Sequence, residues 1–102
     1  MMDIEIKKDG GALDVAVSGR LDTATAPELD SALKQEITDA VSALTVDLAE
    51  LDYISSAGLR VLLAAQKQMN ATGGSMRVLH PNEVVLEIFD VTGFDEILTI
   101  ES

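Results

Sequence analysis

The sequence predicts a single domain of mixed α/β class, in which a four- to five-stranded β-sheet with an N-terminal β-hairpin is packed by three to four α-helices. Two observations predict this class. Apolar and polar residues alternate over residues 3–18, which is the two-residue period of half-buried strands. Further along, segments with helical spacing alternate with short strand-like segments, a pattern that favours parallel strands covered by helices. The 102 residues, taken as one unit over 1–102, have the size of one small domain.

The N-terminal hairpin is predicted by two alternating segments with a turn between them. The turn is Asp9-Gly10-Gly11, a combination typical of tight connections between strands. The apolar residues that recur at every second position in the two strands are Ile4, Ile6, Leu13, Val15 and Val17.

A first helix is predicted over residues 24–39, where Leu29, Leu33 and Ile37 recur at helical spacing. Pro27 suits a first helical turn, and either Asp22 or Thr23 is expected to cap the helix. A strand is predicted next, over residues 44–48, from the alternation of Leu, Val and Leu with polar residues.

A second helix is predicted over residues 56–71, and the pair of glycines at 73–74 is expected to end it. A short strand follows over residues 76–79, and a third helix over residues 82–91. The segment 94–98 is expected to add one helical turn, and residues 99–100 a short last strand.

Composition excludes several classes of function. The net charge of −11 leaves no basic patch for nucleic acid and would repel an anionic membrane surface. A protein partner with a basic face is favoured instead. Cysteine is absent, the apolar runs are too short to span a bilayer, and the first residues do not resemble a signal peptide. We therefore expect a cytoplasmic protein and, for an acidic module that binds another protein, a monomer.

An enzymatic function is poorly supported. His80 is the single histidine, and Ser55 lies in a strand-to-helix turn, but the glycines that flank a nucleophilic serine in hydrolases are absent. Asp47, Glu50 and Asp52 are acidic neighbours without the spacing of a known cation loop, so a solvated acidic rim is the simpler interpretation. No catalytic residue, metal or cofactor is expected.

The start of the second helix is the most informative segment. Ser55 and Ser56 stand where a loop becomes a helix, so free backbone N–H groups and the positive end of the helix dipole face them. A serine at this point can simply cap the helix. A phosphate at the same point would be stabilised locally and would bring a charge of about −1.5 to −2 into an interface.

The residues around this segment resemble the STAS domain. The resemblance is carried by Gly19-Arg20-Leu21-Asp22 and by the run from Ser55 through Gly58-Leu59, and it extends over essentially the whole chain. It implies a STAS-like mixed sheet that is covered by helices mainly on one face. A chain of this length resembles the bacterial anti-anti-sigma factors, also called anti-sigma factor antagonists.

The resemblance implies a function of partner switching without catalysis. The unphosphorylated domain would bind an anti-sigma factor, itself a serine kinase of histidine-kinase-like fold, and thereby release the sigma factor. Phosphorylation at the start of the second helix would dissociate the complex, and a metal-dependent serine phosphatase would reverse it. The resemblance also implies a partner-binding surface made of Asp22, Ser55, Ser56, Ala57, Gly58, Leu59 and Arg60.

The sequence departs from the family at the phosphoacceptor. The usual run is Asp-Ser-Ser/Thr-Gly-Leu, with the acceptor directly before glycine, and this column holds Ala57 here. Ser56 is the first choice as acceptor and Ser55 the second. The alternative is that the chain is a non-phosphorylated STAS subunit of a transporter, such as a lipid-transport ATPase complex, or of a sensory complex.

Overall fold

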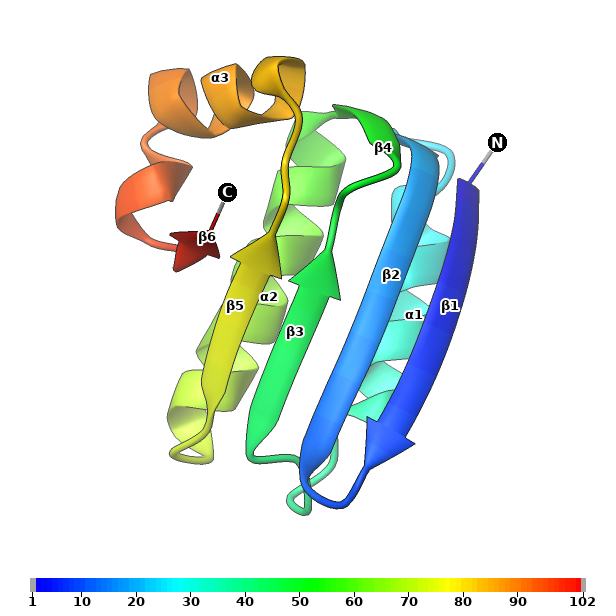
Figure 1. Cartoon of the computed structure of the whole chain (residues 1–102), viewed down its shortest axis with the longest axis vertical. Helices are drawn as coiled ribbons and strands as arrows, with labels where there is room; N and C mark the ends of the chain where they lie inside the picture. Colours follow the sequence, from blue (N-terminus) through cyan, green and yellow to red (C-terminus); the bar gives the residue numbers. More distant parts are fainter. Residues whose placement is uncertain (1, 102) are drawn as a thin grey trace.

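The computed structural model describes residues 2–101. They form six strands, three α-helices and a short 3₁₀ helix (Figure 1). In chain order these are β1 (Met2–Asp9), β2 (Ala12–Leu21), α1 (Ala26–Glu36), β3 (Ala43–Asp47), β4 (Leu51–Ile54), α2 (Ser56–Ala71), β5 (Ser75–Leu79), α3 (Glu83–Thr92), η1 (Phe94–Glu96) and β6 (Ile100–Glu101).

The strands form one mixed sheet in the order β1-β2-β3-β5-β6. β1 and β2 are the predicted antiparallel hairpin, and the other pairs along this order are parallel. The sixth strand, β4, lies outside the order and pairs in parallel with the end of β2, after a shift of register between Gly19 and Arg20. The predicted mixed α/β fold is confirmed. β4 was not predicted, because four residues are too few to show an alternating pattern.

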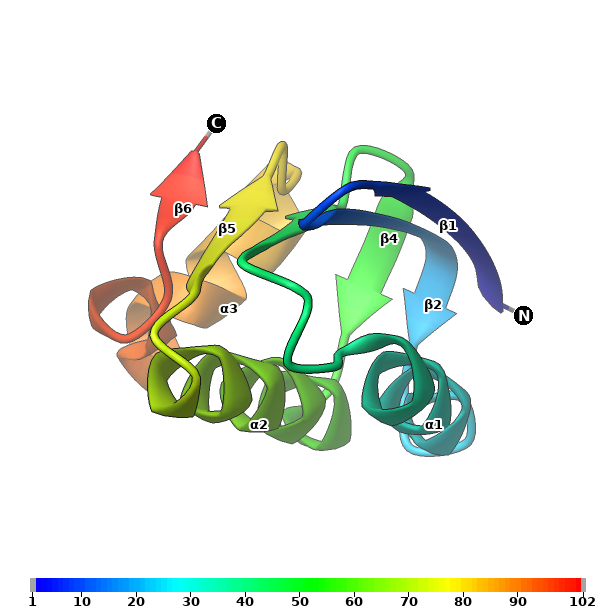
Figure 2. The same cartoon turned by 90° about the horizontal axis from the view of Figure 1, so that it is seen from below.

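α1 and α2 lie side by side against one face of the sheet, and no helix of the described residues 2–101 lies on the opposite face (Figure 2). The core fills the space between this face and the helices. It is almost entirely aliphatic, as the composition requires. The largest fully buried side chains are Phe89, Leu13, Leu21, Leu29, Leu44, Leu48, Leu51, Ile54, Leu62, Met69, Val15 and Val17.

The predicted bounds of α1 were too wide at both ends. The helix begins at Ala26, with Thr25 as its N-cap residue, so neither Asp22 nor Thr23 caps it. It ends at Glu36 because Ile37 has an extended backbone, which turns the Ile37 side chain into the core. The helical spacing of Ile37 therefore indicated its burial correctly but not its conformation.

α2 has the predicted bounds, and α3 begins one residue later than predicted. Asn82 is the N-cap of α3: its Oδ1 accepts a hydrogen bond from the Val85 backbone N at 2.8 Å. The Asn82 Nδ2 donates to the Leu51 carbonyl oxygen at 3.0 Å. This bond joins the start of α3 to β4 at the end of the sheet where β2 also ends (Figure 1). Within residues 2–101, no helix is both long and apolar enough to cross a membrane.

Candidate functional site

The candidate site lies where β2 and β4 end side by side. Leu21 and Ile54 are register partners, and the Ser55 backbone N donates to the Leu21 carbonyl oxygen at 2.8 Å. The next residue of each segment, Asp22 on one and Ser55 on the other, therefore leaves the sheet at the same edge. The structure thus brings together two segments of the expected surface that are more than thirty residues apart in the sequence.

Ser55 and Ser56 have different roles at the start of α2. Ser55 is the N-cap, because its Oγ accepts a hydrogen bond from the Gly58 backbone N at 3.3 Å. Ser56 is the first residue of the helix and its side chain is exposed. Among residues 2–101, the Ser56 hydroxyl has no hydrogen-bond partner. The capping function is thus carried by Ser55, which leaves the Ser56 hydroxyl open to solvent.

Two of the predicted partner-binding residues face the core. Leu59 is only 4% exposed, and Gly58 is buried. A Cβ at position 58 would lie 2.7 Å from the Leu21 Cγ and 2.9 Å from the Ile54 Cγ1, so the close approach of α2 to these strand ends requires glycine. Gly58 and Leu59 can position the surface but cannot present side chains to a partner. Ala57 is half-buried, and Arg60 is exposed.

Asp22 holds the turn that precedes α1. Its Oδ1 accepts hydrogen bonds from the backbone N of Ala24 at 3.0 Å and of Thr25 at 3.1 Å. In return, the Asp22 backbone N donates to the Thr25 Oγ1 at 2.9 Å. The backbone bond from Thr25 lowers the pKa of the Asp22 carboxyl, with smaller contributions from the Thr25 hydroxyl, Ala24 and Arg20, against an opposing effect of burial. The carboxylate is therefore ionised and fixed beside the site.

Arg20 and Tyr53 also belong to this edge, and the sequence analysis did not single them out. They are register partners on β2 and β4, and the Arg20 guanidinium lies over the Tyr53 ring, 4.6 Å from its centroid. The Arg20 Nε is 4.0 Å from the Asp22 Oδ2. Recognising this pair required knowledge of β4, since only the pairing of β4 with β2 puts residue 53 opposite residue 20.

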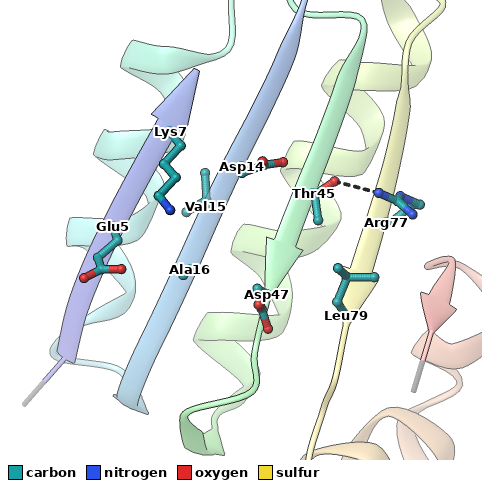
Figure 3. A pocket seen from close by; sticks show the side chains of 9 residues that line it. All are labelled: Glu5, Lys7, Asp14, Val15, Ala16, Thr45, Asp47, Arg77 and Leu79. Atoms are coloured by element: carbon teal, nitrogen blue, oxygen red, sulfur yellow. Dashed lines mark hydrogen bonds between the residues drawn. The ribbon is translucent and has the colours of Figure 1, made fainter. Parts of the chain in front are cut away.

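Two of the hollows on the surface bear on the site. One, of about 320 Å³, lies between the N-terminal turns of α1 and α2 and borders Ala57 and Arg60. The other, of about 410 Å³, lies on the sheet face opposite α1 and α2 (Figure 3). The small side chain of Ala16 lies in this hollow, and both acidic and basic side chains line it. Arg77 at its rim is hydrogen-bonded to Thr45 and paired with Glu101, so this cation is already engaged within the chain.

Neither a hydrolytic nor a metal site is formed by the residues considered for them. The His80 Nδ1 is 3.3 Å from the Asp47 Oδ1, and no serine within residues 2–101 is hydrogen-bonded to the His80 ring. Among the same residues, no three acidic or histidine side chains are grouped so as to hold a metal ion. His80 is a loop residue with an ordinary hydrogen bond.

Comparison with known proteins assigns the family. The model of the STAS domain matches residues 3–102. The chain belongs to the STAS domain family. This confirms the resemblance that the sequence indicated, and it agrees with the sheet order and helical layer of the structure.

Three examples illustrate what this STAS domain is similar to. BtrV of Bordetella bronchiseptica, described as an anti-sigma factor antagonist, is 40% identical over 57 residues, which cover 56% of this chain and 49% of BtrV. The chain thus spans about half the length of the curated relatives it matches. The crystal structure of an anti-sigma factor antagonist from Mycobacterium paratuberculosis has a TM-score of 0.88 at 26% identity, over 99% of this chain and 86% of that one. Bacillus SpoIIAA in its phosphorylated form has a TM-score of 0.77 at 16% identity, over 98% and 92%, which shows the shared fold alone.

Proposed function

We propose that this STAS domain is an anti-sigma factor antagonist that binds an anti-sigma factor through the surface around Ser56. The proposal is supported by the family, by the names of the relatives, and by one structural observation. That observation is the exposed Ser56 hydroxyl at the first position of α2, beside an N-cap that Ser55 already supplies. The role is one of binding, and the domain acts as a ligand and substrate of its partner rather than as a catalyst.

Phosphorylation of Ser56 by the same anti-sigma factor, acting as a serine kinase, would end the complex. The first turn of a helix favours a negative charge, so the phosphate would be accommodated without unfolding α2. Arg60 lies one helical turn after Ser56, at the i+4 spacing that lets opposite charges pair. The equivalent position after Ser55 is the buried Leu59, which offers no such partner. Ser56 is therefore the proposed acceptor, and a metal-dependent phosphatase would restore the unmodified state.

The competing function is that of a STAS subunit in a transporter or sensory complex that is never phosphorylated. Ala57 favours it, because this half-buried residue occupies the column of the usual acceptor and has no hydroxyl. The two functions differ in whether any phosphate is transferred to the start of α2.

The test uses the purified protein with ATP and, one at a time, the purified anti-sigma factor kinases encoded in the genome of its source. We expect one kinase to bind at micromolar concentration and to place a phosphate on Ser56, as mapped by mass spectrometry. Ser56→Ala should abolish the transfer. Ser55→Ala should retain it while losing about 1 kcal/mol of stability, since only Ser55 caps the helix.

Ser56→Asp should weaken the complex while the stability of the protein stays within about 1 kcal/mol of the original. Absence of both a complex and a phosphate with every such kinase would refute the proposal. A complex without any phosphate would favour the non-phosphorylated STAS subunit.

A further inference from the structure

The groove between α1 and α2 borders Ala57, the residue next to Ser56. α1 and α2 lie side by side and pack against each other (Figure 2). The groove lies between their first turns. Ala26 and Pro27 form its apolar wall on α1, and Ala57 and Val61 form the wall on α2. With a volume of about 320 Å³, it is large enough for one leucine, methionine or phenylalanine side chain of another protein.

The charges at the rim of this groove are unequal. Asp30 on the α1 side is paired with Lys34, whose Nζ is 2.8 Å from the Asp30 Oδ2. Arg60 on the α2 side is exposed and, among residues 2–101, forms no ion pair. It is one of only seven basic residues in a chain of net charge −11. The groove therefore presents an apolar slot with one uncompensated positive charge beside it.

We propose that this groove is the anchor point for the anti-sigma factor, which inserts one apolar side chain between α1 and α2 and pairs a neighbouring carboxylate with Arg60. The inference rests on the proposed function and names the chemistry of the partner at that same surface. An apolar anchor in a desolvated pocket with an arginine at its edge is the arrangement that dominates the affinity of many interfaces. The carboxylate of the partner is required by charge complementarity with Arg60.

Arg60 also connects this anchor to the phosphate. A phosphate on Ser56 stands four residues before Arg60 on the same side of α2, and its charge of about −1.5 to −2 exceeds that of a carboxylate. Phosphorylation would therefore draw Arg60 away from the partner and add repulsion against the carboxylate of the partner. The same arginine would hold the complex together in one state and neutralise the phosphate in the other.

The helix itself supplies matched controls for a test. Ala64 and Lys67 lie seven residues after Ala57 and Arg60 respectively, and both are exposed. Two helical turns separate each pair, so the control residues face nearly the same way but stand roughly 10 Å further along α2. Ala57→Leu places a larger side chain in the groove, whereas Ala64→Leu adds the same side-chain atoms to α2 outside the groove. Arg60→Glu and Lys67→Glu make the same change of charge.

The measurement is the dissociation constant of each unphosphorylated variant with the purified anti-sigma factor kinase that binds the original protein, in the absence of ATP. We expect Ala57→Leu and Arg60→Glu each to weaken the complex about tenfold or more, the range of interface anchors. The controls Ala64→Leu and Lys67→Glu should stay within about twofold. Circular dichroism of all four variants verifies that they are folded.

A second measurement concerns the switch. Phosphorylation of Ser56 should weaken binding by a smaller factor in Arg60→Ala than in the original protein, because part of its effect acts through Arg60. An equal factor in both backgrounds would overturn this link. If the original protein binds its kinase and Ala57→Leu and Arg60→Glu bind it as tightly as the original does, the proposed anchor in the groove is wrong and the proposed function stands. If no kinase binds the original protein, both fail.

Discussion

Replacing Gly58 by alanine should destabilise the fold, and removing the Leu21 side chain should relieve part of that loss. An added methyl group would lie 2.7 Å from the Leu21 Cγ, 3.0 Å from the Leu21 Cδ2 and 2.9 Å from the Ile54 Cγ1. Carbon atoms in contact prefer about 3.5–4.0 Å, so either α2 or the strand ends must shift. Overpacking of this kind costs about 1–3 kcal/mol, and the better helix propensity of alanine returns about 1 kcal/mol. The net loss should be about 1 kcal/mol.

The double variant makes the reasoning specific. Leu21→Ala alone should cost about 3 kcal/mol, because Leu21 is fully buried. In Gly58→Ala/Leu21→Ala two of the three close contacts are gone, and the new methyl group partly fills the cavity. We therefore expect the double variant to lose about 1 kcal/mol less stability than the two single variants lose in sum. This difference is within the range measured for residues in contact.

The assay is urea unfolding followed by far-ultraviolet circular dichroism, since the chain has no tryptophan and a single tyrosine. Stability changes are taken from the midpoint at a constant m-value. Leu44→Ala is the control for Leu21→Ala: Leu44 is equally buried but pairs with Leu13, which stands roughly 26 Å before Leu21 along β2. Gly58→Ala should be additive with Leu44→Ala. Additivity with Leu21→Ala as well, or a stabilising Gly58→Ala, would refute the packing argument.

Two further predictions concern the turns that position the site. The folded-state pKa of Asp22 is lowered, so the stability contributed by its carboxylate is complete above its unfolded pKa of about 3.9 and is lost as the pH falls through the folded pKa. The difference in urea midpoint between the original protein and Asp22→Asn should therefore shrink from pH 7 to pH 3. A difference that stays constant over this range would contradict the prediction. Asn82→Ala should cost about 2 kcal/mol, since it removes both the cap of α3 and the donor to the Leu51 carbonyl, whereas Asn82→Asp keeps the capping acceptor and should cost about half as much in the same assay. Equal losses would mean that the cap of α3 contributes nothing, and no loss in Asn82→Asp would mean that the bond to β4 contributes nothing.

The sequence by itself determined the features that depend only on residues close to one another along the chain. Period-two alternation and a glycine turn predict the β1–β2 hairpin, and a serine before an amphipathic segment predicts the start of α2. These signals are short in range, and they placed Ser55 and Ser56 at the start of the helix before any contact was known. Their motif also indicated the family.

The tertiary structure decided which side chains of that segment are available. Residues 57–60 read as one surface in the sequence, but the packing of α2 on Leu21 and Ile54 turns Gly58 and Leu59 inward and leaves Arg60 outward. The pairing of β4 with β2 and the groove between α1 and α2 likewise join residues about thirty positions apart. Local sequence patterns do not predict such contacts. The contacts depend jointly on the length of β2, on its register shift and on the packing of the two helices.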